Sequence, residues 1–227
     1  MAQASIPVDL FNPGQVFACM GFLEAADVLL GQGEGGFDWT NEYQVRFEVR
    51  AGGGRNPVEA VLEFLVTAQF ERLAPKGYAD PLPTKSESHK KRGKKPAGNP
   101  ASGVDDSGGD GPLLLVETFP ALEADRLALP LRFKRDGHYL DVTHWCDASS
   151  RNPFKLFAGQ QRSAAIAQQM LAGVKALWSQ RREKLASDPL GLTLPLGGSS
   201  FKMDARKAWT AIDAGYSPDE QSQNVEA

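Results

Sequence analysis

The sequence predicts an α+β fold, with a mixed and partly antiparallel sheet, a buried N-terminal helix and a long helix in the C-terminal half. Two alternating segments flank Arg135-Asp136-Gly137, which is typical of a hairpin with antiparallel strands. A strongly apolar segment at residues 15–30 indicates a helix inside the fold. The order of predicted strands and helices does not follow the regular alternation of a doubly wound parallel sheet.

The chain opens with a short alternating strand at residues 6–10, which leads into Asn12-Pro13-Gly14. Pro13 fixes φ and Gly14 relieves the steric limits of a turn, so we expect a sharp turn here. The apolar segment that follows has few polar residues and several small ones. We therefore expect a helix that is buried on most sides.

The remaining elements follow from periodicity and end signals. Asn56 and Pro57 have the residue types of an N-cap and a first helical position. The predicted strands are residues 43–49, 113–119, 128–134 and 138–143, and the predicted helices are residues 57–73, 160–186 and 204–214.

The chain of 227 residues, 41% of them hydrophobic, is long enough for one good core. Residues 83–111 are rich in Gly, Ser, Pro and charge and nearly free of large apolar groups, so we expect a flexible insertion. We predict a single α+β domain over residues 1–227, interrupted at about residues 83–111.

The two cysteines, Cys19 and Cys146, lie far apart and have no paired spacing. Neither a disulfide framework nor a zinc knuckle is indicated. Glu24 and Asp27 interrupt the first apolar segment, and no basic region precedes it, which argues against a secretory signal or a membrane span. We expect a cytoplasmic protein that does not interact with a membrane.

The formal net charge of −3 conceals an uneven distribution. Residues 1–81 carry 5 Lys and Arg against 11 Asp and Glu, whereas residues 132–207 carry 13 against 6. This asymmetry is compatible with one side that faces a polyanion. Clustering of solvated helix faces by sign explains it equally well.

The evidence for catalysis in the sequence is weak. Gly52-Gly53-Gly54-Arg55 precedes a predicted helix, but it lacks the Lys and Ser/Thr of a Walker loop and the spaced glycines of a dinucleotide fingerprint. A hairpin-like loop before a capped helix is the simpler interpretation. A nucleotide-using enzyme remains the least favoured alternative, and we predict no catalytic residues and no cofactor.

A metal site is also disfavoured. His138, His144 and Cys146 would share a face of a regular strand, with Asp141 nearby in sequence. Regular strand spacing spreads such donors along a line, so they could bind one metal ion only if the strand curled. We predict no metal site.

Binding to nucleic acid has better support. Two stretches interleave cations, amides and aromatic residues, one directly before the long predicted helix and one from Phe201 to Trp209. They supply phosphate-seeking charge and flat stacking surfaces. The predicted nucleic-acid-binding residues are Arg151, Lys155, Arg162, Lys202, Arg206 and Lys207, and weaker candidate contacts are Asn12, Arg55, Phe154 and Trp209.

The opening and closing segments of the chain also resemble a known family. Asn12-Pro13-Gly14-Gln15 and Gly21-Phe22-Leu23-Glu24, together with residues 155–160 and 213–218, are similar to blocks of the Csb-type proteins encoded beside type I-U CRISPR loci. These proteins are regarded as large-subunit-like components of Cascade. The resemblance covers both ends and the long predicted helix but not the insertion.

The resemblance implies a noncatalytic subunit of an RNA-guided ribonucleoprotein complex in antiviral defence. Guide pairing reads the target in such assemblies, and protein subunits supply backbone contacts and local duplex recognition. The implied partners are other Cascade subunits, guide RNA, target DNA and a recruited nuclease-helicase, and recognition of a target-flanking motif is a further implied role. The chain is short for a Cascade large subunit. A protein–protein scaffold without direct nucleic-acid contact is the alternative.

Overall fold

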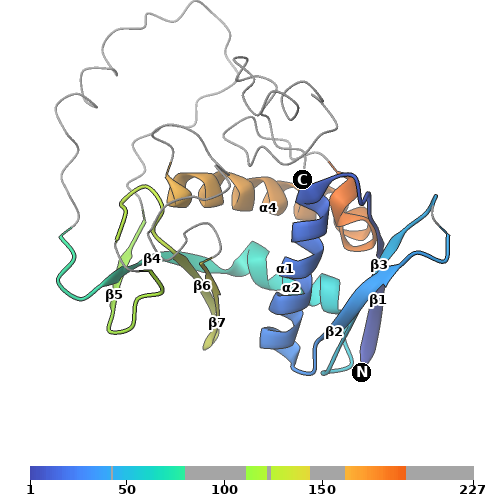
Figure 1. The fold of residues 1–227 in the computed structure, drawn as a ribbon, viewed down its shortest axis with the longest axis horizontal. Helices are drawn as coiled ribbons and strands as arrows, with labels where there is room; N and C mark the ends of the chain where they lie inside the picture. Colours follow the sequence, from blue (N-terminus) through green and yellow to red (C-terminus); the bar gives the residue numbers. More distant parts are fainter. Residues whose placement is uncertain (42, 80–110, 122–123, 144–161, 193–227) are drawn as a thin grey trace, which may run out of the picture.

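The computed structural model describes residues 1–41, 43–79, 111–121, 124–143 and 162–192. Figure 1 shows two sheets on opposite sides of a pair of helices. Sheet A contains β1 (Ala2–Pro7), β2 (Glu34–Asp38) and β3 (Arg46–Ala51), and it is antiparallel in the order β1-β3-β2. Sheet B contains β4 (Gln69–Pro75), β5 (Leu113–Val116), β6 (Leu131–Arg135) and β7 (His138–Val142).

Sheet B is mixed, because β4 pairs with β5 in parallel and with β6 antiparallel, in the order β5-β4-β6-β7. The prediction of an α+β fold with a mixed, partly antiparallel sheet is confirmed. The predicted hairpin is also confirmed: β6 and β7 pair in a register that sets Arg135 opposite His138.

The helices are α1 (Pro13–Leu30), α2 (Pro57–Thr67) and α4 (Ser163–Ser187), and the short 3-10 helix η1 (Pro189–Gly191) follows α4. Asn12 Oδ1 accepts hydrogen bonds from the backbone N–H groups of Gly14 (3.0 Å) and Gln15 (3.3 Å). Asn56 Oδ1 accepts one from Glu59 (3.1 Å). Proline follows both caps, which fits the first helical turn because proline has no N–H to satisfy.

The core has two connected parts. One packs α1, sheet A and part of α2 against the end of α4, around the fully buried Ile6, Phe47 and Val49. The other packs the rest of α2 and the start of α4 against the inner face of sheet B, around Leu131 and Ile166. The partly buried residues that contact both parts are Leu29, Leu65, Leu140 and Met170.

The ends of α1 and β3 meet through their backbones. Gly31, with φ 74°, ends α1, and its carbonyl accepts a hydrogen bond from the N–H of Gly52 at 2.8 Å. A Cβ on Gly52 would lie 2.6 Å from the carbonyl oxygen of Leu30, a distance at which backbone must move. Glycine at position 52 therefore permits this close approach.

Helix α1 is less buried than its composition predicts. Its inward face holds the buried residues Cys19, Ala25 and Ala26, whereas the side chains of Phe17 (54%), Met20 (47%) and Val28 (53%) are exposed. The expectation of burial on most sides is therefore wrong for one face. Among the described residues, α1 is also the one helix long and apolar enough to cross a membrane, a test that core helices of soluble proteins pass as well.

Two strands, β4 and β2, were not predicted, and β1 spans Ala2–Pro7 rather than the expected residues 6–10. The helix predicted over residues 57–73 ends at Thr67, and β4 begins at Gln69. Helical spacing continues past Thr67 without a Gly or Pro stop, but the segment gains two strand partners, β5 and β6. Tertiary pairing therefore outweighs local periodicity. β2 was not predicted, because Gly35-Gly36 has low strand propensity.

Candidate functional site

The β6–β7 hairpin determines which side chains face outward on sheet B. Asp136 (φ 49°) and Gly137 (φ 82°) both have positive φ, as a two-residue type I′ turn requires. The register sets Arg132 opposite Asp141 and Lys134 opposite Tyr139. Because strand side chains alternate, these four side chains lie on the outer face.

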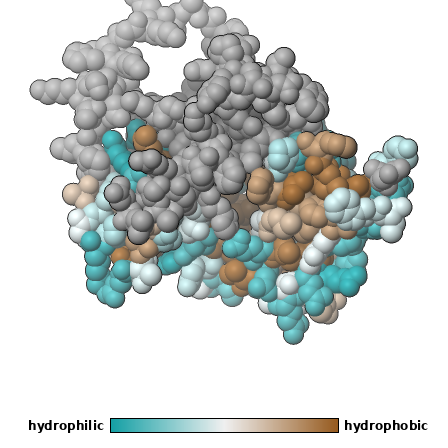
Figure 2. Space-filling view, viewed as in Figure 1, coloured by the Kyte–Doolittle hydropathy of each residue, from teal (hydrophilic) through white to brown (hydrophobic). Residues whose placement is uncertain are grey.

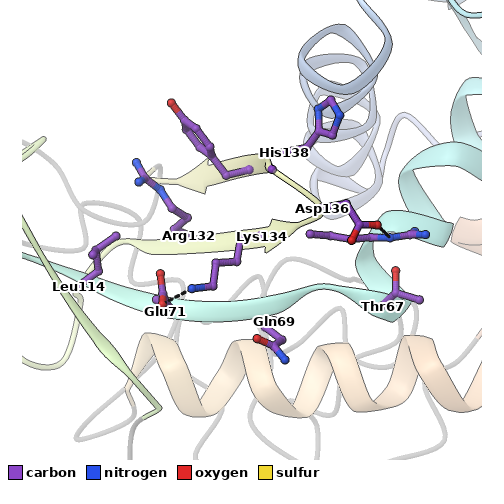
Figure 3. A pocket seen from close by; sticks show the side chains of 11 residues that line it. Thr67, Gln69, Glu71, Leu114, Arg132, Lys134, Asp136 and His138 are labelled. Atoms are coloured by element: carbon purple, nitrogen blue, oxygen red, sulfur yellow. Dashed lines mark hydrogen bonds and ion pairs between the residues drawn. The ribbon is translucent and has the colours of Figure 1, made fainter.

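A groove of about 490 Å³ lies on this face, and we call it the sheet B groove (Figure 3). The hairpin and the first half of β4 supply most of its lining, with Leu114 from β5 at one side. The polar and aromatic residues that line it are Thr67, Gln69, Glu71, Arg132, Lys134, Arg135, Asp136, His138 and Tyr139.

Arg132 is the most firmly positioned cation in the groove. Its Nε and Nη2 donate to Asp141 Oδ1 and Oδ2, both at 2.7 Å, in a two-bond pair. The same guanidinium lies 4.2 Å from the centre of the Tyr139 ring. The hydrogen bond to Asp141 raises the pKa of Arg132, so the guanidinium stays charged throughout the accessible pH range.

The other cations of the groove are also paired. Lys134 Nζ forms an ion pair with Glu71 on the neighbouring strand β4 (Figure 3). Arg135 Nε lies 3.1 Å from Asp136 Oδ2, and its Nη1 donates to the backbone carbonyl of Glu63 at 3.1 Å. These contacts hold the long side chains along the sheet, which reduces the entropy that a ligand contact would cost.

Tyr139 gives the groove a flat apolar surface. Its side chain is 53% exposed, and it lies near the turn of the hairpin, as the second residue of β7. An exposed ring with a guanidinium on one face can stack with a planar ligand group, and the guanidinium can contact an anion beside it. The groove therefore suits a ligand that combines planar rings with negative charge.

Sheet A carries a second groove of about 320 Å³, lined by Gly35, Gly36, Phe37 and four charged residues, and we call it the sheet A groove. The charged residues are Glu34, Asp38, Glu48 and Arg50. Three carboxylates against one cation make this surface unfavourable for a phosphate-bearing ligand. The lining of the sheet B groove instead has three cations and two carboxylates.

The described residues contain no group of three or more His, Cys, Asp or Glu side chains able to hold a metal ion. His138 is exposed at the start of β7, while His144 and Cys146 lie outside the described residues. Gly53 and Gly54 adopt positive φ in the loop before α2, and Arg55 pairs with Glu63. This loop matches the interpretation of a turn before a capped helix.

Three of the sequence-predicted contact residues are described. Arg162 is partly exposed directly before α4, and Arg55 is exposed beside α2. Asn12 is 1% exposed and caps α1, so it does not present a surface to a ligand. The other candidates lie outside the described residues: Arg151, Phe154, Lys155, Lys202, Arg206, Lys207 and Trp209.

The structure adds Arg132, Lys134 and Tyr139, which are not among the contact residues predicted from the sequence. The signal was present, because the predicted hairpin around Asp136-Gly137 fixes a register that aligns these residues on one face. The chain matches no protein-family model, and searches of curated proteins and of solved structures also found no match.

Proposed function

We propose that this protein is a noncatalytic subunit that binds single-stranded nucleic acid on the outer face of sheet B. The observation that carries the proposal is the Tyr139 ring, which is half exposed and has the Arg132 guanidinium 4.2 Å from its centre. Nucleotides are the common ligands that combine a planar ring with a phosphate. Base stacking on an exposed ring needs no particular sequence.

The paired cations of the groove fit this role. A phosphate that approaches Lys134 or Arg132 competes with Glu71 or Asp141, which already hold the cation in an extended position. Net attraction from this face is therefore modest, and stacking supplies most of the affinity. Additional phosphate contacts come from the cations predicted on either side of α4, with Arg162 among them.

The assembly that we propose is the RNA-guided CRISPR interference complex implied by the resemblance to Csb-type proteins. In such a complex, base pairing with the guide provides sequence specificity, so a protein subunit needs only backbone and stacking contacts. The sheet B groove offers these two kinds of contact and has no described metal-ligand cluster.

Binding of fluorescent single-stranded RNA and DNA to the full chain, measured by anisotropy, tests the proposal. Tyr139→Ala should weaken binding by about 1–3 kcal/mol, the usual value of one stacked base. Tyr139→Phe should retain wild-type affinity because the ring remains. Arg162→Glu and Lys202→Glu should weaken binding and lower the dependence of affinity on salt.

Tyr43→Ala is the matched control, because Tyr43 is 89% exposed but lies outside the groove. Equal losses for Tyr43→Ala and Tyr139→Ala would overturn the assignment to sheet B. Crosslinks from the assembled complex that involve protein alone, and never nucleic acid, would instead support the scaffold alternative.

A further inference from the structure

The outward face of α1 is an exposed apolar stripe. At 100° per residue, Phe17, Met20, Gly21, Glu24 and Val28 fall on one side of the helix, and all five are exposed. Figure 2 shows hydrophobic surface over the part of the molecule where α1 lies in Figure 1. The stripe spans about 16 Å from Phe17 to Val28 at the rise of an α-helix.

We infer that the C-terminal segment, residues 193–227, docks on this stripe of α1 in the same chain. The described chain ends close to the first turn of α1. Leu192 is 7% exposed and packs in the core beside sheet A. The carbonyl of the nearby Leu190 accepts a hydrogen bond from Gln15 Nε2 (3.4 Å), in the first turn of α1.

The C-terminal segment is also long enough to reach α1. Eleven residues, 193–203, separate Leu192 from the helix predicted over residues 204–214, and an extended chain of that length spans up to about 36 Å. Helix α1 has 18 residues, or about 27 Å. The segment can therefore reach every turn of α1 from the point where it leaves the core.

The helix predicted over residues 204–214 is complementary to the stripe. In helical conformation, Ala205, Ala208, Trp209 and Ile212 share one face, with the i, i+3, i+4, i+7 spacing of a helix that packs against a surface. The predicted helix of eleven residues also matches the length of the stripe. Trp209 supplies the large ring that such a contact needs as its anchor.

Photo-crosslinking in the full chain tests the inference directly. p-Benzoylphenylalanine in place of Trp209 keeps a large ring at that position. Irradiation of a mixture of isotopically light and heavy protein distinguishes crosslinks within one chain from crosslinks between two copies. We expect crosslinks to residues 11–28 within one chain. Crosslinks to other elements of the fold, between light and heavy chains, or none at all would overturn the inference.

A labelling experiment measures the strength of docking. In a Cys146→Ser background, Phe17→Cys places one reactive thiol on the stripe, because Cys19 is buried and its pKa is raised to about 12. Adding Trp209→Ala should speed alkylation at position 17 by at least about tenfold, equivalent to about 1.4 kcal/mol of docking free energy. Unchanged labelling would contradict intramolecular docking.

Glu183→Cys is the matched control on the exposed surface of α4, and its labelling should be insensitive to Trp209→Ala. Protection of position 17 that grows with protein concentration would identify a second copy as the occupant and overturn the inference. The test is separate from the nucleic-acid proposal, because labelling is measured without any oligonucleotide. Tyr139→Ala should leave it unchanged.

Discussion

The outer faces of the two sheets both carry paired polar side chains, but they differ in their aromatic residues. On sheet A, Glu48 accepts hydrogen bonds from Gln3 and Ser5 at 2.5 Å, and Arg50 Nε donates to Gln3 at 3.2 Å. On sheet B, Arg132 pairs with Asp141 in the same cross-strand manner. Pairing of this kind satisfies the polar groups of a solvated sheet face and does not by itself mark a binding site.

The difference lies in the rings. The ring that lines the sheet A groove is Phe37, which pairs with the fully buried Phe47 on the core-facing side of the sheet, with ring centres 5.1 Å apart. Tyr139 instead packs under a guanidinium at the surface and stays half exposed. An exposed ring on a rigid strand is therefore the more informative sign of function than the number of charged pairs.

The largest expected effects concern the two cores behind these faces. Phe47→Ala on sheet A and Phe133→Ala on sheet B, at 0% and 7% exposure, should each cost about 3–5 kcal/mol of unfolding free energy. Because four residues contact both cores, each variant should shift one common transition in urea, followed by circular dichroism and tryptophan fluorescence. Two separate transitions would show that the sheets unfold independently.

The second prediction concerns Cys19, which packs in the core beside sheet A. Burial raises its pKa from 9.0 to about 12. Its thiol therefore favours folding below pH 9, and this contribution is lost as pH rises from 9 towards 12. The urea midpoint of the wild type should fall more steeply over this range than that of Cys19→Ala. Parallel pH profiles would show that the thiol is not buried as described.

The third prediction compares the paired charges of the two faces. A double-mutant cycle on Arg132 and Asp141 should give a coupling free energy of about 0.2–1 kcal/mol, because both side chains retain access to water. The Arg50 and Gln3 pair on sheet A, without a full charge on its acceptor, should give less. A larger coupling on sheet A would reverse the expected order.

The smallest effect belongs to Asp38, at the end of β2 beside the sheet A groove. Hydrogen bonds from the backbone N–H and the hydroxyl of Thr40 lower its pKa below the usual 3.8. Its contribution to stability is present above that pH and is lost as pH falls through the lowered value. Asp38→Asn should remove this acid dependence, measured as the change in Tm between pH 5 and 3, while Tyr139→Phe should retain it.

Short sequence motifs correctly predicted the turns and helix starts that depend on neighbouring residues alone. Asn56-Pro57 marks a helix start, Asn12-Pro13-Gly14 marks the turn that leads into α1, and Asp136-Gly137 marks the hairpin, since each depends on a few adjacent residues. β4 could not be predicted, because its strand conformation comes from partners 40 or more residues away in the chain. The two-residue turn fixes the hairpin register that places Arg132 and Tyr139 on one face, so this part of the candidate site could have been predicted from the sequence.

Prediction of burial failed for a similar reason. Composition identified α1 as apolar, but the choice of buried face depends on which elements lie beside it. Cys19 and Ala26 face sheet A and α2, while Phe17 and Val28 face away. A helix that is apolar on all sides gives no sequence signal for its exposed face.

The backbone contact between Gly31 and Gly52 offers a way to recognise distant relatives of this chain. A side chain at position 52 would collide with the carbonyl of Leu30, so a protein that keeps this junction must keep glycine there, whatever happens to its surface. Protein sequences with little overall similarity to this chain can be screened for this pair of glycines. One glycine ends an apolar helix, and the other follows a short strand. Candidates that lack it would have to join the helix to the sheet in another way.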